Sequence, residues 1–486
     1  MTKKKILFLT FDLISLAPNL LSAQVKDKYE VYKLTFLDHG WLNRVYPTLD
    51  CNDLDIPKIV NFCGSFDYVA ISSMSTNKEE VFLISDSIRK KISTKVIVGG
   101  PLGIYEKEET GKHCDVVCYW EGDNLIEVLD LLDSKYKQKT VPNFWLTKEK
   151  FEFNVKSVDK LGDLPFQNIF YEDEFIYLNK KIIKQKKKFN IYGVESARGC
   201  FFNCPYCSNH YLNKVKALNN IKIYRKKSIS RVIDEIKELS PYADQIRLSD
   251  DNFFFRDLEE IKFFVNKFNK IGNIQLVLDL DFRSKDYLGK AKEISKIKNW
   301  IAGTGIQSGS SRLRFDVFNR HISTSKILYL FNKTLKMCRE SKNNIELSYS
   351  FILGYPKERL SDILENLNFI LKLRGSGVGL GLNIYTNILQ TNKTEKCAKH
   401  FYDTQSENFK KYSFYYFLHY LLNHLIYHRI DYFLPKQLND SIFFRILNFR
   451  AFSGIYSFFI DMIYKSNQKT IRKSVLDSLE LNNAKD

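Results

Sequence analysis

Long apolar runs are missing from this chain of 486 residues, and none of its apolar stretches could cross a bilayer without interruption. The basic start resembles that of a signal peptide, because lysines at positions 3–5 precede the apolar residues 6–9. Asp12 and Asn19 interrupt the apolar run, however, and no cleavage site of small residues follows. We therefore expect a buried first strand there.

A disulfide framework is also lacking. Nine cysteines are an odd number in a large chain, which argues against systematic pairing and indicates a reducing compartment. An apolar content of 44% and a charged content of 27% are typical of globular proteins. We predict a cytoplasmic protein of about two to four domains.

Acidic residues are in deficit. The chain has 56 of them and 74 lysines and arginines, which gives a net charge of +18. Such a balance favours an acidic partner: nucleic acid, an anionic membrane surface, or phosphate-bearing cofactors and substrates. The positive charges are scattered, and no signature of a nucleic-acid recognition module accompanies them. We expect no nucleic acid partner, and a general drift of composition toward lysine, asparagine and isoleucine is the simpler explanation.

The most informative stretch that is present is a loop with three cysteines, Cys200, Cys204 and Cys207. Soft ligands this close together suit an iron–sulfur cluster or zinc. Three thiolates would leave one iron of a four-iron cluster open to a ligand that is not protein. The alternative is a Cys₃His zinc site with His210, although structural zinc sites generally pair their ligands across a longer loop.

Residues 1–140 alternate strands with helices, which predicts a parallel, doubly wound α/β sheet of the Rossmann-like or flavodoxin-like kind. Strands are expected at residues 6–10, 30–36, 68–72, 95–98 and 116–119. In such sheets a ligand lies across the carboxyl ends of the strands. Ser73, Ser75, Gly99 and Gly100 are expected at those ends, although a domain of this kind that binds nothing remains an alternative.

Residues 191–398 repeat a strand and helix pattern six times, which predicts a partial TIM-type (β/α)₆ barrel with its functional groups at the strand ends. After the first strand, which leads into the cysteine loop, the strands are expected at residues 245–249, 275–279, 302–306, 347–353 and 381–385. We interpret residues 141–190 as a connector. Residues 399–486 form an aromatic, basic, helical region, interpreted as a cap on the barrel, with peripheral membrane contact as the alternative. Three histidines in it at near-helical spacing are better explained as packed or surface residues than as a metal site: His419, His424 and His428.

The cysteine spacing, with Tyr206 just before the last cysteine, closely resembles the cluster motif of the radical S-adenosylmethionine (SAM) enzymes. The serine loop, the Val-Gly-Gly-Pro run and the acidic-glycine pair at residues 121–122 resemble the cobalamin-binding domain that precedes the barrel in one subfamily. The resemblance covers about residues 1 to 395. It implies three cofactors: a [4Fe–4S] cluster on Cys200, Cys204 and Cys207, SAM bound to its unique iron, and cobalamin.

The resemblance also implies roles for single residues. Ser249, Asp250 and Asp251 would accept hydrogen bonds from the SAM amino group, although the two aspartates alone would suit a helix N-cap. Tyr206 would pack on the adenine, Gln307 and Ser308 would bind the ribose or carboxylate, and Gly354 would let the adenine approach. Ser73, Ser75, Gly99 and Gly100 would surround the dimethylbenzimidazole tail of cobalamin. Arg198 would pair with a carboxylate or brace the loop, and Arg283 would by default form a salt bridge at the barrel rim.

One departure concerns the cobalt. The methionine synthase type of cobalamin domain carries a histidine ligand in the loop after its first strand, and residues 11–19 contain no histidine. The stretch Asp38-His39-Gly40 follows the second strand and lacks the spacing. We therefore expect cobalt without a histidine ligand from this loop.

The function that the resemblance implies is methyl transfer from methylcobalamin to a substrate carbon radical, which a 5′-deoxyadenosyl radical generates. A second SAM would remethylate the cobalamin. The expected partners are a small-molecule, lipid or natural-product substrate and an external electron donor of the flavodoxin or ferredoxin type. Two alternatives stay open: a radical cyclase, rearrangement or oxidative enzyme, and a non-catalytic protein with a structural cluster.

Overall fold

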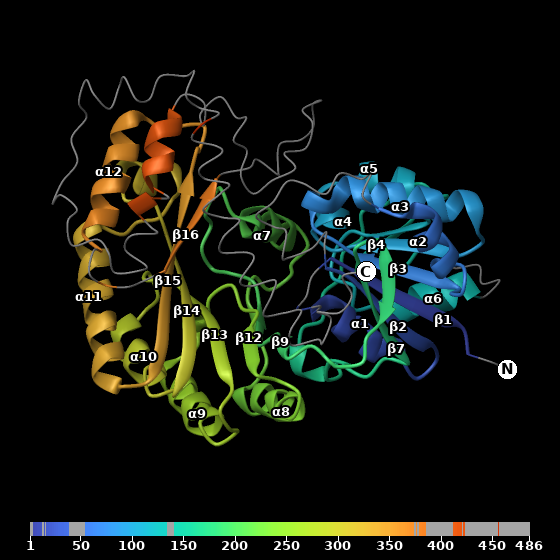
Figure 1. Cartoon of the computed structure of the whole chain (residues 1–486), viewed down its shortest axis with the longest axis horizontal. Coiled ribbons are helices and arrows are strands. Elements are labelled where there is room, and N and C mark those ends of the chain that lie inside the picture. The colour runs from blue at the N-terminus through green and yellow to red at the C-terminus, as the bar shows by residue number, and fades with distance from the viewer. Residues whose placement is uncertain are drawn as a thin grey trace.

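The computed structural model describes residues 3–11, 14, 16–37, 54–133, 140–373, 376, 379–384, 412–419, 421, 422 and 455. These residues form two large sheets in succession along the chain and a two-stranded sheet of β10 (Ala197–Arg198) and β11 (Arg225–Lys226), and the two large sheets with their helices lie beside each other (Figure 1). Both large sheets are mainly parallel, as the alternation of strands and helices predicted.

The first sheet has eight strands in the order β6-β5-β4-β3-β1-β2-β7-β8. Its parallel strands are β1 (Lys5–Thr10), β2 (Glu30–Phe36), β3 (Tyr68–Ser72), β4 (Lys95–Gly99), β5 (Val116–Cys118) and β7 (Asp173–Leu178). Antiparallel strands β6 (Phe144–Leu146) and β8 (Lys181–Lys184) close the two edges. The interpretation of residues 141–190 as a connector was therefore incomplete, because this region supplies three strands to the first sheet.

Side chains of β1 alternate between the two faces of this sheet, and each face has its own core. Ile6 and Phe8 pack beneath helices α1 (Leu16–Val25) and α6 (Leu125–Asp133). Leu7 and Leu9 pack beneath α2 (Ile56–Cys63) and α3 (Lys78–Lys91) on the opposite face. Two short helices, α4 (Pro101–Tyr105) and α5 (Lys107–His113), follow β4. The predicted buried first strand is confirmed.

The second sheet has six strands, all parallel, in the order β16-β15-β14-β13-β12-β9. Its strands are β9 (Ile191–Val194), β12 (Gln245–Leu248), β13 (Gln275–Leu280), β14 (Asn299–Gln307), β15 (Asn344–Leu353) and β16 (Gly379–Ile384). Its helices follow one another around the outside (Figure 1): α8 (Ile229–Leu239), α9 (Leu258–Phe268), α10 (Tyr287–Ile294), α11 (Thr324–Ser341) and α12 (Leu360–Leu371). Because β9 and β16 lie at opposite edges, the described strands form an open barrel, as the sequence predicted.

The concave face of this open barrel is polar and lined by small residues. Four amide side chains bridge neighbouring strands near the amino ends, with hydrogen bonds of 2.5 to 3.1 Å: Gln245, Gln275, Asn299 and Asn344. Nearer the carboxyl ends the same face carries Gly303, Gly305, Ser348 and Ser350, which line a cavity. The amide row occupies one end of the barrel, and the small residues leave space at the other.

The described part of the C-terminal region packs on the barrel. Tyr415 and Tyr416, in a helical segment at residues 412–419, belong to the same hydrophobic core as the barrel strands. This contact agrees with the predicted cap for that segment, while His424, His428 and most of the region proposed for membrane contact lie outside the described residues. Among the described helices, none is long and apolar enough to cross a membrane.

Candidate functional site

The three predicted cluster ligands line one cavity. Cys200, Cys204 and Cys207 lie in the loop between β9 and α7 (Ser208–Leu218), and their cavity has a volume of about 300 Å³. We call this space the thiol cavity; its other walls are the carboxyl ends of β13, β14 and β15. Burial raises the pKa of the Cys200 thiol to about 12, so a bound cation is needed to hold it as thiolate at neutral pH.

The thiol cavity fits a cluster better than a single zinc ion. Among the described residues, no three His, Cys, Asp or Glu side chains are placed to hold a single metal ion. His210 is the fourth ligand that the zinc alternative requires. Its Nδ1 instead lies 2.7 Å from Asn203 Oδ1, and the residue is not part of the cavity wall.

Of the three residues predicted for the SAM amino group, only Asp251 lines the thiol cavity. Its carboxylate accepts a hydrogen bond of 2.7 Å from Asn209. Asp250 is buried elsewhere, accepts backbone hydrogen bonds from Ser196 and Ala197, and burial raises its pKa to about 6. Asp250 thus holds the segment that leads to the cysteines, and Ser249 lies outside the cavity wall.

Of the other predicted SAM contacts, some line the thiol cavity and others do not. Tyr206 and Gln307 line the thiol cavity, and the Tyr206 hydroxyl accepts a hydrogen bond of 3.1 Å from Arg320. Ser308 is fully buried and donates to Asn366 of α12 at 3.0 Å. Gly354, which has a φ of +75°, lies outside the cavity wall and donates its N–H to Glu358. Ser308 and Gly354 thus make structural contacts here, and their roles toward SAM stay predictions.

Glu358 gives a prediction about pH. Burial raises its pKa to about 7, and its Oε2 accepts hydrogen bonds from the Gly354 N–H and the Tyr416 hydroxyl, each 2.7 Å long. The ordinary pKa of a glutamate is 4.5. Between pH 4.5 and about 7, Glu358 is therefore protonated in the folded chain and ionised in the unfolded chain. This difference lowers the free energy of unfolding as pH rises through that range. We expect Glu358→Gln to gain on the order of 2 kcal/mol relative to wild type across that range, measured by thermal melting.

The control for this prediction is Glu365→Gln, because Glu365 is an exposed residue of α12, the helix that begins two residues after Glu358. Its melting temperature should run parallel to that of wild type at every pH. A constant offset between Glu358→Gln and wild type would contradict the prediction.

Sequence reasoning missed a charged network opposite the cysteines. Asp281, just after β13, accepts from Arg283 at 2.8 Å and from Arg320 at 3.0 Å. Although burial acts to raise the pKa of Asp281, Arg320 and Arg283 hold it below its usual range. The default prediction of a salt bridge for Arg283 is confirmed, and Arg283 also reaches Cys204. Long-range pairs of this kind leave no mark in a single sequence.

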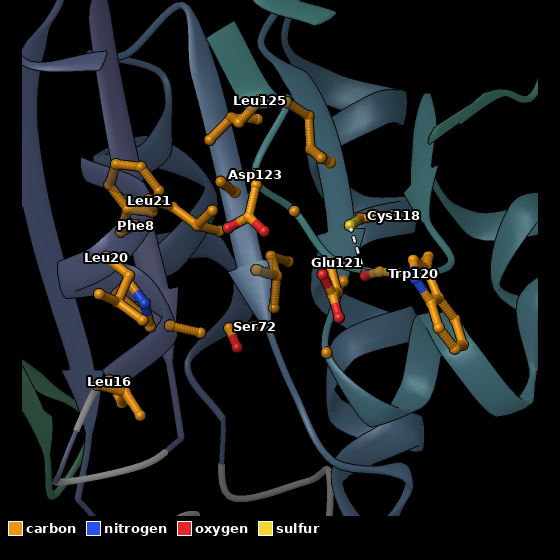
Figure 2. A pocket seen from close by; sticks show the side chains of 18 of the residues that line it. Phe8, Leu16, Leu20, Leu21, Ser72, Cys118, Trp120, Glu121, Asp123 and Leu125 are labelled. Carbon is orange, nitrogen blue, oxygen red and sulfur yellow. Dashed lines mark hydrogen bonds between the residues drawn. The ribbon is translucent and has the colours of Figure 1, made fainter. Parts of the chain in front are cut away.

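A second cavity, of about 220 Å³, lies at the carboxyl ends of β1, β3, β4 and β5 (Figure 2). Figure 2 shows Leu16, Leu20 and Leu21 of α1 on one side and Cys118 and Trp120 on the other. Since apolar side chains form most of its wall, we call it the apolar cavity.

The predicted cobalamin contacts are only partly in this wall. Gly99 and Gly100 line the apolar cavity, together with Ser72. The Ser73 hydroxyl instead donates to the Met74 carbonyl, and Ser75 is buried outside the wall. Gly100 has a φ of +78°, and a Cβ on it would lie 2.7 Å from the Ser73 carbonyl oxygen, so packing of the loop requires this glycine.

One arginine joins the two cavities. Arg198 lies two residues before Cys200, and its guanidinium pairs with Asp123 (2.6 Å), Glu195 (2.7 Å) and Glu121 (3.0 Å). Arg225 forms a second ion pair with Glu121. Glu121 and Asp123, whose side chains appear in Figure 2, line the apolar cavity together with Glu195 and Arg198. The bracing role predicted for Arg198 agrees with these contacts, and they connect the first sheet to the cysteine loop.

Known proteins resemble this chain in sequence. Residues 194–370 match the family model described as the radical SAM superfamily. The chain is 22% identical over 334 residues to the bacteriochlorophyllide d C-8(2)-methyltransferase of Chlorobaculum tepidum, covering 64% of each protein. It is 26% identical over 244 residues to the tRNA-2-methylthio-N(6)-dimethylallyladenosine synthase of Buchnera aphidicola subsp. Cinara cedri, covering 46% of this chain and 53% of that protein. The chain thus spans less than two thirds of either relative.

Solved structures with a similar fold include those of two radical SAM enzymes. The radical SAM methyltransferase TsrM of Kitasatospora setae, with cobalamin and a [4Fe-4S] cluster bound, has a TM-score of 0.54 at 13% identity, covering 80% of this chain and 74% of that one. The cobalamin-dependent SAM radical enzyme OxsB has a TM-score of 0.53 at 15% identity, covering 80% of this chain and 54% of that one. At these identities the likeness concerns the fold.

Proposed function

We propose, from the premise that residues 194–370 form a domain of the radical SAM superfamily, that this chain is a cobalamin-dependent enzyme that methylates a carbon atom of its substrate. The observation that carries the proposal is the pair of cavities, of which the apolar one is lined by Arg198, two residues before the first cysteine of the thiol cavity. One has the three thiols that a [4Fe–4S] cluster needs, and the other is an apolar space at the strand ends of a doubly wound sheet.

Different residues around the thiol cavity would bind the cluster and SAM. Cys200, Cys204 and Cys207 would hold the cluster, while Asp251 and Gln307 offer oxygen acceptors to the amino and hydroxyl groups of SAM. When bound, the cluster and SAM supply an adenosyl radical, and cobalamin supplies the methyl group.

The floor of the thiol cavity indicates how the substrate is bound. Asp279 lines the cavity and accepts from Arg247 at 2.6 Å, and both side chains are more than a third exposed. Burial raises the pKa of Asp279. An apolar ligand would desolvate this ion pair without replacing its hydrogen bonds, so the floor favours a substrate with a polar group at its inner end.

The first test is cofactor content. Protein purified anaerobically and reconstituted should bind about four irons per chain, retain hydroxocobalamin through gel filtration, and pass labelled methyl from SAM to a product. Methyl label found only in methionine, together with unlabelled 5′-deoxyadenosine, would favour cyclisation, rearrangement or oxidation instead. A colourless protein that contains zinc would contradict the proposed radical SAM chemistry.

Ser72→Trp tests the apolar cavity directly. Ser72 ends β3 and lines the cavity, so an indole there would fill much of its 220 Å³. We expect cobalamin retained after gel filtration to fall about tenfold or more, while iron content stays at the wild-type value. The matched control is Ser93→Trp, because Ser93 is exposed before the amino end of β4, at the opposite end of the sheet. Equal cobalamin in both variants would contradict this assignment.

A further inference from the structure

Arg283 makes an unusual contact with one of the three thiols. Its Nη1 and Nη2 both lie 3.5 Å from Cys204 Sγ, within hydrogen-bond reach of a sulfur acceptor. Among the hydrogen bonds that the described residues make to the three thiols, this is the contact that comes from a cation. Cys207 Sγ has a neutral amide donor, Asn209 Nδ2, at 3.8 Å.

The guanidinium is fixed on two further sides. Asp281 accepts from its Nε at 2.9 Å and from its Nη2 at 2.8 Å, and the Phe202 ring lies beneath it with 3.7 Å between Cζ and the ring centroid. Arg320 pairs with the same Asp281 carboxylate. Two guanidinium charges and one carboxylate leave one net positive charge beside Cys204. A cation held this rigidly keeps its direction toward the sulfur when the charge on the sulfur changes.

We propose that Arg283 raises the reduction potential of the cluster through its contact with Cys204, a role that rests on the proposed cluster function. Reduction adds one electron, taken from an external low-potential donor, to the cluster and its thiolates. A fixed positive charge next to a ligand sulfur stabilises this added negative charge more than it stabilises the oxidised cluster. Arg283 is thus a positioning and tuning residue, and the electron does not pass through it.

Arg283 could instead bind the carboxylate of SAM, since it lines the same cavity. The two roles differ in one respect. A guanidinium that acts on Cys204 shifts the potential whether or not SAM is present, whereas one that acts on SAM changes only SAM affinity.

The test is a redox titration of the anaerobically reconstituted full chain without SAM, followed by the electron paramagnetic resonance signal of the reduced cluster. At a fixed potential we expect Arg283→Gln to lower the reduced-to-oxidised ratio about tenfold, equivalent to about 59 mV for a one-electron couple. Arg283→Lys keeps the positive charge but loses the planar guanidinium with its two adjacent donors. Its reduced-to-oxidised ratio should therefore lie between those of Arg283→Gln and wild type. The control is Arg247→Gln, which removes an arginine that pairs with Asp279 of the cavity wall and not with a cysteine.

Iron and sulfide content of each variant separates a change in potential from loss of the cluster. If Arg283→Gln fails to hold four irons, Arg283→Lys decides the question alone. Wild-type potentials in both variants would overturn the proposal, and so would a loss of SAM affinity without a change in potential. Neither result depends on cobalamin or on methyl transfer, so failure of the proposed function would be recognised separately by its own assays.

Discussion

Cys204→Ala will abolish the formation of 5′-deoxyadenosine, with a loss on the order of a thousandfold or more. Cys204 is buried in the wall of the thiol cavity, between the other two cysteines in sequence and in contact with Arg283. Without its thiolate one iron loses its protein ligand, and Arg283 faces the gap that remains. The measurement is deoxyadenosine by liquid chromatography, together with iron content, after incubation with SAM and a strong reductant.

The matched control is Cys338→Ala. Cys338 is a buried cysteine of α11 in the same barrel, and it belongs to the hydrophobic core. Its loss creates a small cavity, at a cost of about 1 kcal/mol, without touching the thiol cavity. Deoxyadenosine formation by Cys204→Ala at the rate of this control would exclude the proposed ligand set.

Arg198→Met will loosen the first sheet from the cysteine loop. The substitution leaves Asp123 and Glu195 without the cation that neutralises them, while Glu121 keeps Arg225. Removing one partner from a buried set of ion pairs costs about 3 to 5 kcal/mol, because the remaining charges stay buried. We expect a lower melting temperature by calorimetry and faster hydrogen exchange in the loop that carries Cys200.

The control for this prediction is Lys262→Met, which removes a surface ion pair with Glu259 on α9. Since exposed pairs contribute little, its melting temperature should match that of wild type. Unchanged exchange in the cysteine loop of Arg198→Met would contradict the bracing role.

The sequence was sufficient to predict the two parallel sheets because buried strands and amphipathic helices alternate regularly along it. The spacing of the three cysteines was also sufficient to predict that they line one site, because a short loop keeps its thiols close together. The interpretation of residues 141–190 as a connector was incomplete because β7 joins the first sheet by pairing with β2, more than a hundred residues earlier. Pairing at that distance depends on the whole fold and not on local pattern.

Neighbouring residues explain most of the remaining differences. Asp250 and Asp251 are adjacent in the chain, and adjacent residues of an extended segment point to opposite sides, so only one could reach the thiol cavity. Asp251 does so, and Asp250 binds the backbone of Ser196. Gln307, which has a left-handed φ of +69° beside a register shift in the pairing of β14 with β15, lines the cavity, whereas Ser308 does not. A motif gives the position in the chain, whereas the register of the strand decides the direction of each side chain.

The small residues of the concave barrel face mark where this protein could be redesigned. A methyl group on Gly303 would lie 2.5 Å from the Asp279 carboxylate, and one on Gly305 would lie 2.1 Å from the Gln307 amide, so a side chain at either glycine would displace a residue that lines the thiol cavity. Ser348 and Ser350 line the same cavity from β15. A library that aims to accept larger or smaller substrates should therefore vary the two serines and leave the two glycines alone.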